Sequence, residues 1–225
     1  MAALLVTALA AALALALAVA VSMEHLAARN HAEAAVTLLA AEAGLEAAAR
    51  DLAGRDDWSP VLAGAERAPA SDDVTAGPLA LPWGARLDVA RETARLTCGR
   101  TAGCTDGQRR APTAERPWGA NNPRWQPFLA APLARLLPAM PGSYVVVWVG
   151  DDVLEEDGRP DRDEAQPGAP GRFVARLHAL ALRPRGARRA VEAVIARPCA
   201  VDNGNEVCGP GIRVQSWHEV RPEVP

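Results

Sequence analysis

The sequence predicts an α+β fold, in which one long N-terminal helix precedes a globular domain built on an antiparallel β-sheet. Residues 1–22 are almost entirely apolar, residues 23–53 are rich in strong helix formers, and residues 143–220 contain several strand-like runs separated by turn residues. We therefore expect a transmembrane helix over 1–22, its amphipathic continuation over 23–53 and a domain over 54–225. Within the domain, residues 54–142 are expected to be loop-rich and residues 143–220 to form antiparallel strands.

The apolar run over residues 2–21 contains only Ala, Leu and Val apart from Thr7. A helix of roughly 20 such residues spans the hydrocarbon core of a bilayer. A cleaved signal peptide normally begins with a basic region and has a shorter apolar core, although Ala18-Val19-Ala20 and Ala20-Val21-Ser22 would each suit a signal peptidase. We prefer the anchor and keep cleavage as the alternative.

Residues 23–53 continue the helix, since they contain no Pro and a single Gly. Leu38, Leu45 and Leu52 recur every seven residues and indicate an apolar stripe that packs on another element. Gly44 costs roughly 1 kcal/mol of helix propensity relative to Ala. Close approach of another helix or of the sheet is one reason for it, and a glycine without a role is the alternative. We expect a Gly44→Leu exchange to weaken incorporation into an assembly of such helices while the domain stays folded.

Several phrases resemble a known family. The continuous helix with the phrase AAEAGLE, residues 40–46, is similar to the N-terminal region of type IV pilin-like proteins, in particular the PilX-type minor pilins. The phrases YVVV, ARRAVEA and VQSWHEV, residues 144–147, 187–193 and 214–220, resemble the C-terminal strands of that group. The resemblance implies a pilin-like fold and a structural subunit that helps to assemble a type IV pilus or a related pseudopilus.

The same resemblance implies partners and a location. The partners are other pilin-like subunits, contacted through the N-terminal helix, and the inner membrane; the domain lies in the periplasm or, within a pilus, at the cell surface. Pilin-like precursors carry a basic leader before the apolar segment and a Glu near its start, whereas the first acid here is Glu24. Either the start lies upstream of Met1, or the helix stays an uncleaved anchor. The alternative function is a membrane-tethered periplasmic binding module.

Four cysteines form two close pairs, Cys98 with Cys104 and Cys199 with Cys208. Neither pair has the spacing of a zinc ribbon, and each encloses turn-forming residues. Two local disulfides are therefore predicted, since such bridges persist in an oxidising compartment.

Charge and motifs exclude several functions. The formal charge of −3 does not indicate a nucleic-acid surface, and all 24 basic residues are Arg. The four histidines are scattered, and the chain has no metalloprotease, nucleophile-elbow, Walker or dinucleotide-binding motif. We therefore name no catalytic residue and expect no cofactor, and a secreted hydrolase with an unrecognised site stays as a third alternative.

The loop-rich region offers weaker patterns. Residues 86–97 alternate weakly and predict one or two strands, whereas the prolines of residues 117–141 allow only short turns. Further on, strands are expected over residues 144–149, 172–182, 189–195 and 212–218, with a turn at Pro184-Arg185-Gly186 and a loop at Asp202-Asn203-Gly204-Asn205.

Residues 151–164 are the most acidic stretch. The preferred interpretation is a solvated loop whose charge neighbouring arginines balance. The alternative is a Ca²⁺ site, because Ca²⁺ takes six to eight oxygen ligands. Its expected ligands are Asp151, Asp152, Asp157, Asp161 and Asp163.

Overall fold

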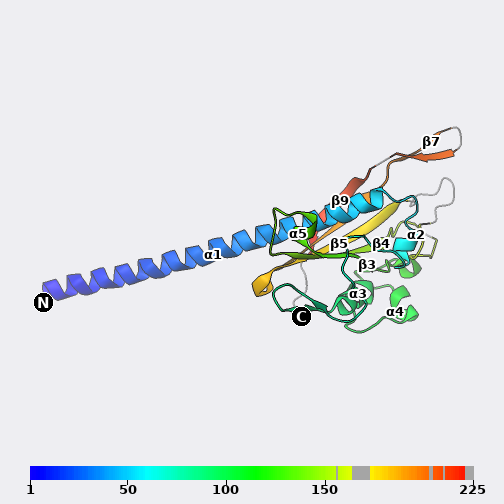
Figure 1. Cartoon of the computed structure of the whole chain (residues 1–225). Coiled ribbons are helices and arrows are strands. Elements are labelled where there is room, and N and C mark those ends of the chain that lie inside the picture. The colour runs from blue at the N-terminus through cyan, green and yellow to red at the C-terminus, as the bar shows by residue number, and fades with distance from the viewer. Residues whose placement is uncertain (156, 164–172, 203–204, 210, 221–225) are drawn as a thin grey trace. The chain divides into compact units, whose positions relative to one another are not determined.

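A computed structural model describes residues 1–155, 157–163, 173–202, 205–209 and 211–220. It contains a long N-terminal helix, α1 (Ala2–Ala53), and a domain with an antiparallel sheet, so the α+β class is confirmed (Figure 1). The chain divides into two compact units, residues 1–36 and residues 37–225. The first unit is the N-terminal part of α1, and the second holds the remainder of α1 and the sheet.

Five antiparallel strands form the main sheet in the order β3-β4-β5-β6-β9. They are β3 (Gln126–Pro132), β4 (Tyr144–Asp151), β5 (Val174–Leu182), β6 (Arg188–Ala196) and β9 (Arg213–Val220). Every residue of β4 is buried, which explains why residues 144–149 are continuously apolar rather than alternating. The four strands expected within residues 143–220 are all present.

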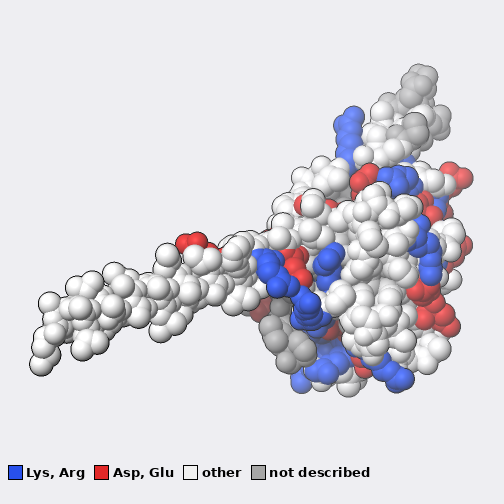
Figure 2. Space-filling view, turned by 60° about the vertical axis from the view of Figure 1, so that its left-hand side comes forward, with Lys and Arg blue, Asp and Glu red and all other residues white. Residues whose placement is uncertain are grey.

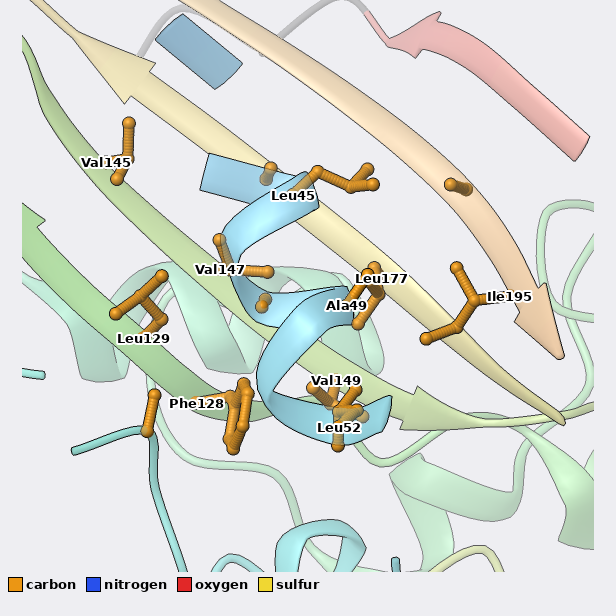
Figure 3. Close-up of a cluster of buried hydrophobic side chains, with 14 of the residues drawn as sticks. Leu45, Ala49, Leu52, Phe128, Leu129, Val145, Val147, Val149, Leu177 and Ile195 are labelled. Atoms are coloured by element: carbon orange, nitrogen blue, oxygen red, sulfur yellow. The ribbon is translucent and has the colours of Figure 1, made fainter. Parts of the chain in front are cut away.

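The C-terminal part of α1 covers one face of this sheet (Figure 3). Alternate residues of each strand point toward this face, and the buried side chains of α1 pack against them. Among these strand residues are Val145, Val147, Leu177 and Ile195. The opposite face packs against residues 74–96, where Trp148 Nε1 donates a hydrogen bond of 2.7 Å to Thr93 Oγ1. The sheet is therefore the middle of three layers.

Short elements complete the domain. They are α2 (Ser59–Leu62), β1 (Leu79–Ala80), β2 (Arg86–Leu87), α3 (Val89–Cys98), α4 (Asp106–Arg110), η1 (Gly119–Asn121), α5 (Leu133–Leu136), η2 (Pro184–Gly186), β7 (Cys199–Asp202) and β8 (Asn205–Cys208). β7 and β8 pair as a separate antiparallel hairpin around the loop predicted there, of which residues 203 and 204 lie outside the described residues. Residue 172, the expected start of β5, and residues 156 and 164 of the acidic stretch lie outside them too.

The expectation of strands over residues 86–97 was wrong for most of that segment, because α3 occupies it. Asp88 caps the helix by accepting a hydrogen bond from the Arg91 backbone N–H, and Gly99 ends it with φ of 70°. These local start and stop signals outweigh the weak alternation of apolar residues. In the Pro-rich region, the expectation of short turns holds for α5, whereas β3 occupies the residues before it.

Candidate functional site

The apolar part of α1 is the first candidate site. α1 is long and apolar enough to cross a membrane. Residues 2–21 are all exposed, and Figure 2 shows the beginning of this helix without charged atoms. Its polar side chains bond to the helix itself, since Thr7 Oγ1 donates to Leu4 O and Ser22 Oγ donates to Ala18 O. Such internal pairing satisfies hydroxyl groups where no water is present.

The second part of α1 packs on the sheet of its own domain. Leu45 and Leu52 are buried, and Leu38 is partly buried against the same core. A Cβ atom added to Gly44 would lie 3.1 Å from both Cβ and Cγ2 of Val145 on β4. The close approach predicted at Gly44 is thus to the sheet. A Leu there would collide with a buried strand, so the expectation that Gly44→Leu leaves the domain folded no longer holds.

Arg197, which sequence reasoning missed, holds the C-terminal end of α1. Its guanidinium donates hydrogen bonds to the backbone carbonyls of Leu52 and Ala53, at 3.4 and 3.0 Å, and to that of Arg55. It also lies over the ring of Phe173, 4.4 Å from the ring centroid. The last carbonyls of a helix have no partner within the helix, and Leu52 O here also accepts from Trp58 Nε1 at 2.9 Å. A cation at a helix C-terminus also opposes the helix dipole.

Both predicted cysteine pairs form disulfides. Cys98–Cys104 closes the segment after α3, and Cys199–Cys208 joins the outer ends of β7 and β8. Cys199 and Cys208 also pack against the core beneath α1. The second bridge therefore closes the base of the β7–β8 hairpin, and the packing of its two cysteines places that base against the core.

The acidic stretch does not lie in solvent as a whole. Asp151, Asp152, Glu155 and Asp163 are buried, whereas Asp157 is exposed and Asp161 half-buried. Asp163 Oδ1 accepts a hydrogen bond of 2.6 Å from the Phe173 backbone N–H, so this carboxylate organises the chain that enters β5. The preferred expectation of a solvated loop is wrong for these four buried carboxyl groups.

Burial, strengthened by the charge of Glu155, raises the pKa of Asp151 to about 9. Asp151 Oδ1 is buried without a hydrogen-bond partner among the described residues. Across the same described part of the chain, no three acidic, His or Cys side chains are placed to hold one metal ion. The Ca²⁺ hypothesis for Asp151, Asp152, Asp157, Asp161 and Asp163 therefore gains no support from the geometry.

A second polar group lies within the sheet. His178 is buried between Trp125 and Trp148, and its Nδ1 lies 3.0 Å from Glu192 Oε1 on the paired strand. Burial alone would raise the pKa of Glu192, but the hydrogen bond from His178 and the charges of His178 and Arg176 hold it below its ordinary value. This arrangement satisfies His178 within a packed environment, as a structural histidine requires.

Comparison with known proteins identifies no relative: no family model, no curated protein and no solved structure matches this chain. The functional interpretation therefore rests on the chemistry and geometry of the chain itself.

Proposed function

We propose that this chain is a structural subunit of a type IV pilus or related pseudopilus, anchored in the inner membrane before assembly, with its domain in the periplasm. The observation that carries the proposal is the division of labour within α1. Its residues 2–21 are apolar and exposed, whereas all of its buried residues lie between Thr37 and Leu52. One helix thus supplies both an apolar segment and a core element of the domain.

The physical logic concerns where the apolar segment is stable. In a bilayer its side chains contact lipid tails, and its backbone is satisfied by its own helical hydrogen bonds. A second apolar environment is a bundle of identical or related helices, where van der Waals packing replaces lipid contacts. A subunit that moves from the first environment to the second needs no refolding of its domain, because that domain is packed by another part of α1.

The test is to express the full chain together with the pilus machinery and to separate membranes from sheared fibres. We expect the chain in both fractions, and we expect a Leu9→Arg, Leu13→Arg variant in neither, since each Arg at the centre of a spanning helix costs about 2.5–3.5 kcal/mol. Leu9→Met, Leu13→Met is the matched control and should behave as the original. A chain in neither fraction, with a free N-terminus near Val21 or Met23, would show a cleaved signal and overturn the proposal.

The alternative is a binding module tethered by α1. It predicts the chain in the membrane fraction and never in fibres. A cavity beside α3 is the observation that favours a ligand-binding role for the domain.

A further inference from the structure

A cavity of about 530 Å³ opens beside α3 and the start of β3. Its apolar lining includes Val89, Ala94 and Trp125, which are all buried. Pockets that bind small organic molecules have volumes of about 300–1,000 Å³, mostly apolar walls and a few polar groups. In size and lining, this cavity belongs to that class.

One polar group in the cavity lacks a partner. Thr97 lines the cavity, is 6% exposed, and its Oγ1 is buried without a hydrogen-bond partner among the described residues. Thr93, one turn earlier on α3, differs because its hydroxyl accepts from Trp148 and donates to Val89 O. Buried hydroxyl groups are normally paired, so Thr97 Oγ1 is an unsatisfied group behind the cavity wall, with almost no surface of its own open to the cavity.

The charge of the lining selects a type of ligand. Three arginines line the cavity: Arg67 pairs with Asp73 at 3.7 Å, and Arg109 pairs with Asp106 at 3.2 Å. Arg124 has no ion-pair or hydrogen-bond partner in the part of the chain that the structure describes. Asp161 is the one acidic residue among the described residues of the lining. Three arginines against this one carboxylate give the lining itself a charge of +2, which favours an anionic ligand, and Arg124 is the arginine left to pair with it.

We propose that this cavity binds a small organic carboxylate with an apolar body. Arg124 pairs with the carboxylate, whose two oxygens match the two-donor geometry of a guanidinium. The apolar walls, among them Val89, Ala94 and Trp125, cover the body of the ligand. A phosphate without an apolar part would leave these walls uncovered, and a neutral analogue would leave Arg124 unpaired.

The probe is 2-naphthoate, and binding is measured by equilibrium dialysis against the full chain in lipid nanodiscs, with empty nanodiscs as blank. We expect a Kd of about 1 mM or below, the strength typical of a ligand with about thirteen heavy atoms. The neutral 2-naphthamide and inorganic phosphate should each bind at least about tenfold more weakly. Equal binding of all three compounds would overturn the proposal.

Variants locate the site. Arg124→Gln should weaken 2-naphthoate binding about tenfold and leave 2-naphthamide binding unchanged, because it removes only the ion pair. Arg86→Gln, an exposed arginine on β2 outside the cavity, is the matched control and should change neither. Ala90→Leu, which fills the exposed rim of the cavity, should weaken the binding of both aromatic compounds.

Near-ultraviolet circular dichroism confirms that each variant is folded. Identical 2-naphthoate binding by Arg124→Gln and Arg86→Gln would refute the assignment.

Discussion

Asp151 ends β4 inside the domain, where its carboxyl group is 2% exposed. Its pKa lies at about 9 in the folded state, against an ordinary value of 3.8. The folded state therefore binds more protons than the unfolded state between these values, and the free energy of unfolding falls as pH rises through that window. For one group the slope is at most about 1.4 kcal/mol per pH unit.

We predict that Asp151→Asn removes this slope, because the amide resembles the protonated carboxyl and cannot ionise. The variant should be more stable than the original chain at about pH 8 and similar to it near pH 4, where the original carboxyl is protonated in the fold. Urea denaturation across that range measures the difference. Asp106→Asn, an exposed carboxyl on α4, is the control, and equal slopes for all three proteins would contradict the assignment.

At Gly44 the constraint is steric. An added Cβ at 3.1 Å from Val145 forces that side chain to shift, and overpacking a core costs typically about 1–3 kcal/mol. We predict that Gly44→Leu prevents stable folding and that Gly44→Ala lowers the free energy of unfolding despite its better helix propensity. Combined with Val145→Ala, Gly44→Ala should cost less than the sum of the two single changes.

The control for this cycle is Gly54→Ala, since a Cβ there would lie 3.5 Å from the nearest atom, an ordinary contact. Thermal denaturation of the four proteins of the cycle and of this control gives the coupling. If the stability changes of Gly44→Ala and Val145→Ala are strictly additive, the two side chains make no steric contact that affects stability.

At the scale of elements, Arg197 joins the end of β6 to the end of α1. We predict that Arg197→Met lowers the free energy of unfolding by about 1–3 kcal/mol, because it removes the donor to the half-buried Ala53 and Arg55 carbonyls and the contact with the Phe173 ring. Arg197→Lys should restore only part of the loss, since an ammonium cannot reach three carbonyls and stack on Phe173 at once. Arg213→Met, on exposed β9, is the control and should change stability by less than about 0.5 kcal/mol.

The elements differ in how far the sequence predicts them. β4, β5 and β6 are predictable because burial imposes apolar runs or alternation on their residues. β3 escapes prediction because Pro127 and Pro132 suggest turns, yet an edge strand tolerates Pro where its N–H is not needed. α3 could have been found from Asp88 and Gly99, which mark its two ends.

The candidate sites likewise differ in how far the sequence predicts them. The disulfides and the apolar segment depend on neighbours in the chain and are therefore readable from it. The contact of Arg197 with Ala53 joins residues 144 positions apart, and the cavity combines α3 with residues near Arg67 and Arg124. Contacts of this kind form only when distant segments pack together, so no local sequence pattern predicts them.

For the whole molecule, the boundary at residue 36 separates two roles of one helix. The eight buried residues of α1 all lie in the second unit, and they cover the apolar face of the sheet. Removing residues 1–36 therefore removes no core side chain, whereas removing residues 1–53 would expose Val145, Val147 and their neighbours to water.

We predict that residues 37–225 form a water-soluble protein with both disulfides and the melting temperature of the full chain to within a few degrees. Residues 54–225 should fail to fold, because burial of apolar side chains supplies about 25 cal/mol per Å² of covered surface and α1 provides that cover. Circular dichroism, thermal denaturation and size-exclusion chromatography distinguish the two fragments. If the longer fragment aggregates as the shorter one does, residues 1–36 contribute to the fold itself, and the separation of membrane or assembly segment from core element fails.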